Sequence, residues 1–218
     1  MRRIPKSAKL GSMDRETMRA IFARATVGIA GAGGLGSNCA VALARAGVGR
    51  LVIADFDAVS APNLDRQYYF RTQVGRPKVE ALAENLAAID PGVEVSAHLL
   101  RVDPAAARSL YAGCDVIVEA FDDAGAKDML IETCLAAFPR TPIVGASGLA
   151  GVGRFESIRV LRGGNLVLCG DFENEVSAQL PPVAPRVAIV ANLEADLVLD
   201  LLLAAEKSRA LAREANLP

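Results

Sequence analysis

The chain has 218 residues, a length that suits one domain or one domain with a small extension. Hydrophobic residues make up 52% of the sequence and charged residues 22%, which provides a large core and argues against disorder. The formal net charge of −1 excludes a global basic field that would attract nucleic acid or an anionic membrane, and no apolar run approaches the roughly 18 residues that a membrane-spanning helix needs.

The first residues, MRRIPKSAKLGSM, are basic but lack the apolar stretch of a secretory signal. No internal repeat or low-complexity tract divides the rest of the chain. We therefore expect a flexible tail over residues 1–13, a single domain over residues 14–218, and a cytoplasmic protein without nucleic-acid or membrane partners.

Short apolar runs alternate with helical patterns through the first part of the chain. Many residues of these runs are β-branched, which is typical of strands that are buried on both faces of a parallel sheet. The runs lie at 26–30, 50–54, 93–100, 115–121 and 141–147. Right-handed crossovers through the helices between them predict a Rossmann-like, doubly wound α/β fold with a mostly parallel sheet.

The pattern changes after Gly148. Residues 153–172 alternate as a β-hairpin does, with a turn at RGGN, and a loop rich in proline and polar residues follows. The segment 186–207 is apolar almost all round, which predicts a final, mostly buried helix.

A glycine motif follows the first predicted strand and opens a helix. Gly31, Gly33 and Gly36 have the G-x-G-x-x-G spacing, in which the glycines allow a tight turn, close approach to a phosphate and close helix–strand packing. The helix N-terminus offers unpaired N–H groups to an anion. Asp55 ends the second predicted strand, where an acid accepts hydrogen bonds from ribose hydroxyls. At this point a dehydrogenase and an ATP-using enzyme are equally compatible with the sequence.

The polar stretch after the second strand, DFDAVSAPNLDRQ, favours ATP. It contains Asn63, Arg66 and Gln67, and Lys78 follows at the first turn of a predicted helix. The helix dipole disfavours a lysine at that position, so we expect it to face an anion. Arg66 and Lys78 would supply the positive charge that a triphosphate needs and that the overall composition lacks.

Two acids, Asp122 and Asp123, follow the fourth predicted strand. Open α/β sheets bind ligands at this edge, and a carboxylate opposite phosphates commonly holds Mg²⁺. The alternative for either acid is that it caps the helix that follows.

The segments GAGGLGS, DFDAVSAPNLDRQ, GRPKVEAL and FDDAGAK resemble the ThiF/MoeB/HesA family, relatives of the ubiquitin-activating enzymes, and the resemblance spans most of residues 14–205. In its short length the chain is similar to the compact, ThiF-like members of this family. The resemblance implies that Arg66, Lys78 and Asp122 are catalytic and that Asp122 holds Mg²⁺. It also implies ATP contacts for Gly31, Gly33, Gly34, Gly36, Asp55, Asp57, Asn63 and Gln67.

The implied reaction is attack by the C-terminal Gly-Gly carboxylate of a ubiquitin-like, ThiS-like sulfur carrier protein on the α-phosphate of ATP. It yields an acyl-adenylate and pyrophosphate, for sulfur transfer in thiamine biosynthesis. A carboxylate is already a nucleophile, so no general base is required, and we expect His98, the single histidine, to be structural. By analogy, the loop 171–186 guides the carrier tail, and a homodimer forms through helices near 34–46 and 188–205.

Departures from the family pattern concern the cysteines and the amino terminus. The zinc-binding C-x-x-C pairs of longer members are absent, so no zinc is expected. Cys39, Cys114 and Cys134 are interpreted as small buried residues. Cys169 is either a reactive thiol or a packed strand residue. The arginine that longer relatives send to a partner subunit has no clear counterpart, since Arg15 and Arg19 lack its motif.

Two other functions remain open. A ThiF-like enzyme could adenylate a small molecule or a tRNA base, although the near-neutral charge counts against tRNA. The glycine loop and Asp55 also allow an NAD-dependent oxidoreductase or a dinucleotide sensor. In that case Arg66, Lys78 and Asp122 have no role, and a hydride-transfer acid is lacking.

Overall fold

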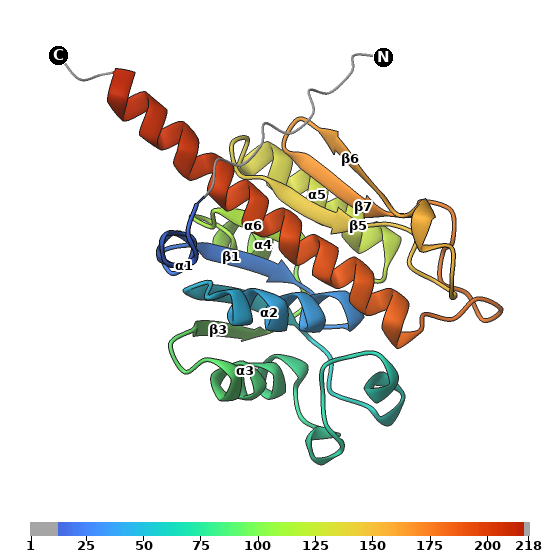
Figure 1. The fold of residues 1–218 in the computed structure, drawn as a ribbon. Coiled ribbons are helices and arrows are strands. Elements are labelled where there is room, and N and C mark those ends of the chain that lie inside the picture. Colours follow the sequence, from blue (N-terminus) through green and yellow to red (C-terminus); the bar gives the residue numbers. More distant parts are fainter. Residues whose placement is uncertain (1–12, 216–218) are drawn as a thin grey trace.

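The computed structural model describes residues 13–215, with no side chains described for 214 and 215. The expected amino-terminal tail therefore lies outside the described residues except for Met13. Within residues 13–215 the protein has a seven-stranded sheet with helices on both faces (Figure 1). The doubly wound α/β architecture expected from the sequence is confirmed.

The sheet has the strand order β3-β2-β1-β4-β5-β7-β6. All neighbouring strands pair in parallel except β6 and β7, which form the expected antiparallel hairpin at one edge. The strands are β1 Thr26–Ala30, β2 Arg50–Asp55, β3 Glu94–Leu99, β4 Val116–Glu119, β5 Ile143–Ala146, β6 Arg159–Gly163 and β7 Leu166–Gly170. The order reverses between β1 and β4, so the carboxyl ends of these two strands form the crevice where such sheets bind ligands.

Helices α1, α4 and α5 begin at aspartate residues that cap them. Asp14, Asp103 and Asp123 each accept a hydrogen bond from the backbone N–H three residues later, at the starts of α1, α4 and α5. The α-helices are α1 Arg15–Phe22, α2 Gly34–Ala46, α3 Lys78–Ile89, α4 Pro104–Leu110, α5 Ala124–Ala137 and α6 Ala184–Ala215. Short 3₁₀ turns occupy Ala61–Asp65, Arg71–Gln73 and Phe155–Ser157.

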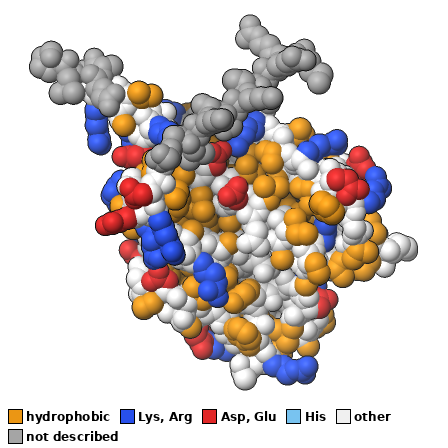
Figure 2. Space-filling model, viewed as in Figure 1, with side chains coloured by type: hydrophobic (Ala, Val, Ile, Leu, Met, Phe, Trp, Pro, Cys, Tyr) orange, Lys and Arg blue, Asp and Glu red, His pale blue; other side chains and the backbone are white. Residues whose placement is uncertain are grey.

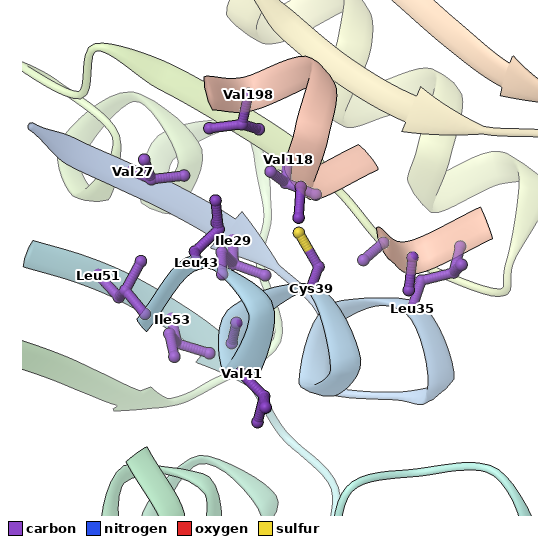
Figure 3. Close-up of a cluster of buried hydrophobic side chains, with 14 of the residues drawn as sticks. Val27, Ile29, Leu35, Cys39, Val41, Leu43, Leu51, Ile53, Val118 and Val198 are labelled. Atoms are coloured by element: carbon purple, nitrogen blue, oxygen red, sulfur yellow. The ribbon is translucent and has the colours of Figure 1, made fainter. Parts of the chain in front are cut away.

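The core has two layers, one on each face of the sheet. The larger layer lies between the sheet and helices α2, α3 and α6, where Ile29, Leu43 and Val198 are fully buried (Figure 3). The smaller layer packs α4 and α5 on the opposite face around Tyr111 and Leu130. Because both faces are covered, the central strands are mostly apolar, as the sequence indicated, although β4 ends in the buried Glu119.

Helix α6 differs from its prediction in length. It begins at Ala184 and continues to Ala215, and its last turns extend beyond the sheet (Figure 1). Val187, Val190 and Val198 are buried, whereas Leu211 is 66% exposed. The apolar pattern of the sequence therefore corresponds to the part of α6 that covers the sheet. Among the described residues, no helix is both long and apolar enough to cross a membrane.

Candidate functional site

The glycine turn joins β1 to α2 at the carboxyl edge of the sheet. Gly31 has a φ of +101°, and a Cβ there would lie 2.7 Å from the carbonyl oxygen of Ala120. A Cβ on Gly36 would lie 1.9 Å from the carbonyl oxygen of Gly31. These two glycines therefore let the backbone of the turn pack against backbone, as the spacing predicted.

Gly33 has a different environment. It precedes the first residue of α2, where no side chain caps the helix, and its φ of −79° is open to any residue. A Cβ on Gly33 would approach only Nε2 of Gln67, at 3.8 Å. The start of α2 thus combines a positive helix end with open space, which is the arrangement that binds a phosphate.

Asp55 lies beside the glycine turn, at the end of β2. Its Oδ2 accepts a hydrogen bond from the N–H of Ala32, and its Oδ1 accepts one from the N–H of Asp57, both at 2.7 Å. A carboxylate has about four lone-pair sites, so these bonds fix its orientation and leave capacity for hydroxyl donors. The expected ribose-binding role of Asp55 stays a prediction.

Lys78 is the first residue of α3, and the anion that it faces in the structure is Asp57. Lys78 Nζ lies 2.7 Å from Asp57 Oδ2, and the backbone N–H of Lys78 donates to the carbonyl of Asp57. The lysine side chain is 7% exposed and the aspartate side chain 48%. Asp57 therefore braces the loop and holds the lysine at the edge of the sheet where β2 ends.

Asn63 lies in the 3₁₀ turn Ala61–Asp65 after β2, and Arg66 and Gln67 directly follow that turn. Asn63 Oδ1 accepts from the N–H of Ser60, and Arg66 Nη1 donates to Asp65 Oδ1 at 2.7 Å. The side chain of Asp65 is 64% exposed and forms this ion pair. Gln67 Oε1 is buried and has no hydrogen-bond partner among the described residues. An unpartnered acceptor beside the glycine turn fits a site that is completed by a ligand.

Three residues that the sequence did not indicate fasten this segment to the glycine turn. Ser37 Oγ donates to the carbonyl of Gly33 and accepts from the N–H of Tyr68. Asn38 Nδ2 donates to the carbonyl of Arg66, and the hydroxyl of Tyr69 donates to the carbonyl of Ala32 at 2.7 Å. Ser37 and Asn38 directly follow the last glycine of the motif, which was a usable signal. No local pattern connects Tyr69 to the turn.

The two acids after β4 have separate positions. Asp123 Oδ1 accepts from the N–H of Ala126 at 2.8 Å and caps α5. Asp122 is exposed and forms no hydrogen bond or ion pair with a described residue. The capping alternative therefore applies to Asp123, and the carboxylate of Asp122 is available to a ligand.

The side chains at this edge of the sheet include few ligands for a metal ion such as Mg²⁺. In the described part of the chain, no three His, Cys, Asp or Glu side chains group closely enough to hold a metal ion. Mg²⁺ in nucleotide sites commonly takes one or two carboxylates and fills its remaining positions with phosphates and water. A single free carboxylate, Asp122, beside an open helix start fits that kind of site.

Glu119, Lys127 and Glu194 form a buried ionisable cluster beneath the carboxyl end of β4. Lys127 Nζ contacts Glu119 Oε2 and donates to the carbonyl of Ala146 at 3.2 Å. Glu194, from α6, is fully buried, and neither of its carboxyl oxygens has a partner among the described residues. Burial raises the pKa of Glu194 well above its ordinary value; Glu119 raises it further and Lys127 opposes the shift. The buried position of Glu194 therefore favours its uncharged form more than water does.

All four cysteines are buried, as expected for Cys39, Cys114 and Cys134. Burial raises the pKa of the Cys169 thiol, Glu194 raises it further, and Lys127 opposes the shift. A thiolate is the reactive form of cysteine, so these surroundings favour the packed-strand interpretation of Cys169 over the reactive one.

Gly36→Ala should strongly destabilise the protein, because the added Cβ would meet the carbonyl oxygen of Gly31 at 1.9 Å. We expect a loss of at least about 3 kcal/mol in the free energy of unfolding, measured by urea denaturation. Gly33→Ala is the matched control, since the same methyl group meets open space there, and it should cost less than about 1 kcal/mol. Equal losses in the two variants would contradict this account of the turn.

Glu194→Gln keeps the side-chain shape and removes the ionisable group. The folded-state pKa is raised, so Glu194 adds most stability below the unfolded-state pKa, and that contribution is lost as the pH rises toward the folded-state pKa. Above about pH 4.3, the free energy of unfolding of the wild type should fall by about 1.4 kcal/mol per pH unit relative to that of the variant. The fall should end where the pH reaches the folded-state pKa of Glu194. Urea denaturation at a series of pH values measures this difference. A difference that does not change with pH would show that Glu194 does not titrate in this way.

Comparison with known proteins identifies the family of the chain. The model of the ThiF family matches residues 6–217. The chain is 29% identical over 191 residues to the molybdopterin-synthase adenylyltransferase of Salmonella typhimurium, covering 82% of this chain and 73% of that protein. It is 35% identical over 122 residues to the sulfur carrier protein ThiS adenylyltransferase of Escherichia coli, covering 56% of this chain and 48% of that protein.

Solved structures share the fold. The crystal structure of the E. coli tRNA N6-threonylcarbamoyladenosine dehydratase TcdA in complex with ATP superposes with a TM-score of 0.81 at 24% identity, covering 88% of this chain and 91% of that one. At this identity the likeness shows the architecture alone. The family model spans nearly the whole sequence, and on that ground the chain belongs to the ThiF family, whose curated members cited above are adenylyltransferases.

Proposed function

We propose that the chain is a cytoplasmic adenylyltransferase, formed by a single domain over residues 14–218, that activates a ubiquitin-like sulfur carrier protein with ATP. The observation that carries the proposal is the pairing of an open helix start at Gly33 with the unpartnered carboxylate of Asp122. The two lie on adjacent strand ends, because β1 pairs with β4 and the N–H of Ala120 donates to the carbonyl of Ala30. A nucleotide with a metal ion would fill this edge.

The residues around this edge divide between the parts of ATP. The N–H groups at the start of α2 would bind phosphate, with Gly31, Gly34 and Gly36 shaping the turn, and Asp55 would accept hydrogen bonds from the ribose. Asn63, in the 3₁₀ turn, and Gln67, just after it, would support the phosphates. Gln67 Oε1, buried without a partner, would gain one from the ligand or its water.

Arg66 and Lys78 would stabilise charge on the phosphates during the reaction. The nucleophile is the carrier's terminal carboxylate, which attacks the α-phosphate and displaces pyrophosphate. That carboxylate is ionised at neutral pH, so catalysis rests on positioning and on electrostatic stabilisation. Asp122 would hold Mg²⁺, whose role when bound is to neutralise charge on the phosphate oxygens.

The carrier tail would enter beside the segment 171–186. A buried ion pair fixes both ends of this segment, because Arg186 Nη2 lies 2.5 Å from Asp171 Oδ2 and Arg186 Nη1 donates to the carbonyl of Gly153. Val152, Phe155 and Val176 remain 77%, 71% and 55% exposed. These apolar side chains next to a well-fixed loop suit a protein partner, and we propose that a ThiS-like carrier with a Gly-Gly tail binds here for thiamine biosynthesis.

We also propose a homodimer through the face on which α2 and α6 lie side by side (Figure 1). Apolar side chains cover much of the centre and right of that face (Figure 2). Ile189 on α6 is 47% exposed. A second copy would remove this surface from water.

The carrier-adenylate is the product that tests the proposal. Mixing the protein with ATP, Mg²⁺ and a panel of Gly-Gly-tailed carriers should add one AMP to the correct carrier, which mass spectrometry detects. Mg-ATP, and not NAD, should raise the melting temperature of the protein. Exchange of pyrophosphate into ATP without any carrier would instead favour a small-molecule or tRNA substrate. Stabilisation by NAD alone would favour an oxidoreductase.

Arg66→Ala and Lys78→Ala should each lower carrier-dependent ATP–pyrophosphate exchange by about 10²- to 10³-fold, because each removes a positive charge from the phosphate site. Loss of Lys78 leaves Asp57 half exposed to water, so folding should survive the change. Arg76→Ala is the matched control, since Arg76 pairs with Glu84 on the outer surface two residues before Lys78. Wild-type exchange in either test variant would remove that residue from the site.

A further inference from the structure

Glu119 and Lys127 have no role in the chemistry proposed above, yet they enclose the turn that carries Asp122. We propose that this buried ion pair is a positioning device that holds the carboxylate of Asp122 where the metal ion of a metal–nucleotide complex binds. The inference rests on the proposed nucleotide site and assigns a function to two residues outside it.

The contacts of the pair fix the turn on both sides of Asp122. Glu119 is the last residue of β4, and its Oε1 accepts from the N–H of Phe121, at 2.8 Å, directly before Asp122. Its Oε2 contacts Lys127 Nζ, which comes from the first turns of α5, after Asp122. Lys127 also donates to the carbonyl of Ala146 at the end of β5. The ion pair thus ties β4, β5 and α5 together around one short turn.

The rest of the turn is restrained as well. The N–H of Ala120 donates to the carbonyl of Ala30 at 2.9 Å, and Asp123 is engaged in capping α5. Asp122 lies between these fixed points and is exposed. Every neighbour of Asp122 is held in place while its own carboxylate is available, which is the arrangement expected for a preorganised ligand residue.

Stability alone is a poor explanation for the pair. Glu119 is fully buried and the side chain of Lys127 is 23% exposed, so both charges have lost much of their hydration. Replacing such a pair with uncharged side chains of similar volume is often neutral or stabilising. Glu194 is close enough to Glu119 and Lys127 for their charges to act on its pKa, but its carboxyl oxygens have no hydrogen-bond partner among the described residues. Lys127 therefore forms its ion pair with Glu119 and not with Glu194. The pair therefore contributes defined geometry more than stability.

Binding of Mn²⁺ to the protein–ATP complex tests the positioning role without turnover. Free Mn²⁺ is measured by electron paramagnetic resonance in titrations of the wild type, Asp122→Asn, and the double variant Glu119→Gln/Lys127→Met, which leaves no unpaired charge. We expect Asp122→Asn to weaken Mn²⁺ binding about 10-fold and the double variant to weaken it to a similar extent. Lys127→Arg, which preserves the charge, should keep wild-type affinity.

Combining the changes separates positioning from a general structural effect. If the pair acts through Asp122, the triple variant should bind Mn²⁺ no more weakly than Asp122→Asn alone. The ion pair of Asp171 and Arg186 supplies a control for Mn²⁺ affinity, since Asp171→Asn/Arg186→Met removes a pair of charges that is more deeply buried than Glu119 and Lys127. That control should stay within about twofold of the wild type.

Wild-type Mn²⁺ affinity in the folded double variant, or additive losses in the triple variant, would overturn the inference. Circular dichroism verifies folding, and Glu119→Leu/Lys127→Leu replaces the double variant if that variant is unfolded. A wild-type protein that binds Mn²⁺ with ATP but forms no carrier-adenylate would contradict the proposed function and not the positioning role. A wild-type protein that binds no Mn²⁺ with ATP would overturn both.

Discussion

The site depends on one close approach of backbone to backbone. Gly36 lies so near the carbonyl of Gly31 that a methyl group between them would be 1.9 Å from the oxygen. This contact sets the angle at which α2 leaves β1, and with it the direction of the free N–H groups at the helix start. Ser37 and Asn38, one and two residues later on the same helix, then fix the polar segment that follows β2. A displaced α2 would move both the phosphate end and the polar segment.

The polar stretch after β2 is organised before any ligand arrives. Asp55 is held by two backbone N–H groups, Asp57 holds Lys78, and Arg66 is engaged by Asp65. Charged side chains held in this way lose little conformational freedom when they bind a ligand, so less binding free energy is spent on ordering them. The arrangement also keeps two cations close to the sheet in a protein whose net charge is −1.

The sequence was most informative where a local pattern determines the structure. Apolar runs located the five parallel strands and the hairpin, and the glycine spacing located the turn at Gly31. The rule that ligands bind at carboxyl strand ends placed Asp55 and Asp122 correctly at one edge. Sequence alone did not show that Asp123 rather than Asp122 caps α5, or that Glu194 is buried without a partner. Those facts depend on which segments meet in three dimensions. The apolar pattern of the last helix predicts that the helix is buried, but it does not predict which groups surround Glu194.

The antiparallel strand β6 has a consequence for how the protein avoids unwanted association. It ends the sheet, so one side of its backbone lacks a neighbouring strand and could template another chain. Arg159 and Arg162 lie on this strand, and Arg162 Nη2 donates to Asp200 of α6 at 3.0 Å. Charged side chains along such a border oppose strand addition. Growth of the sheet from one molecule into the next through the β6 edge is thereby discouraged.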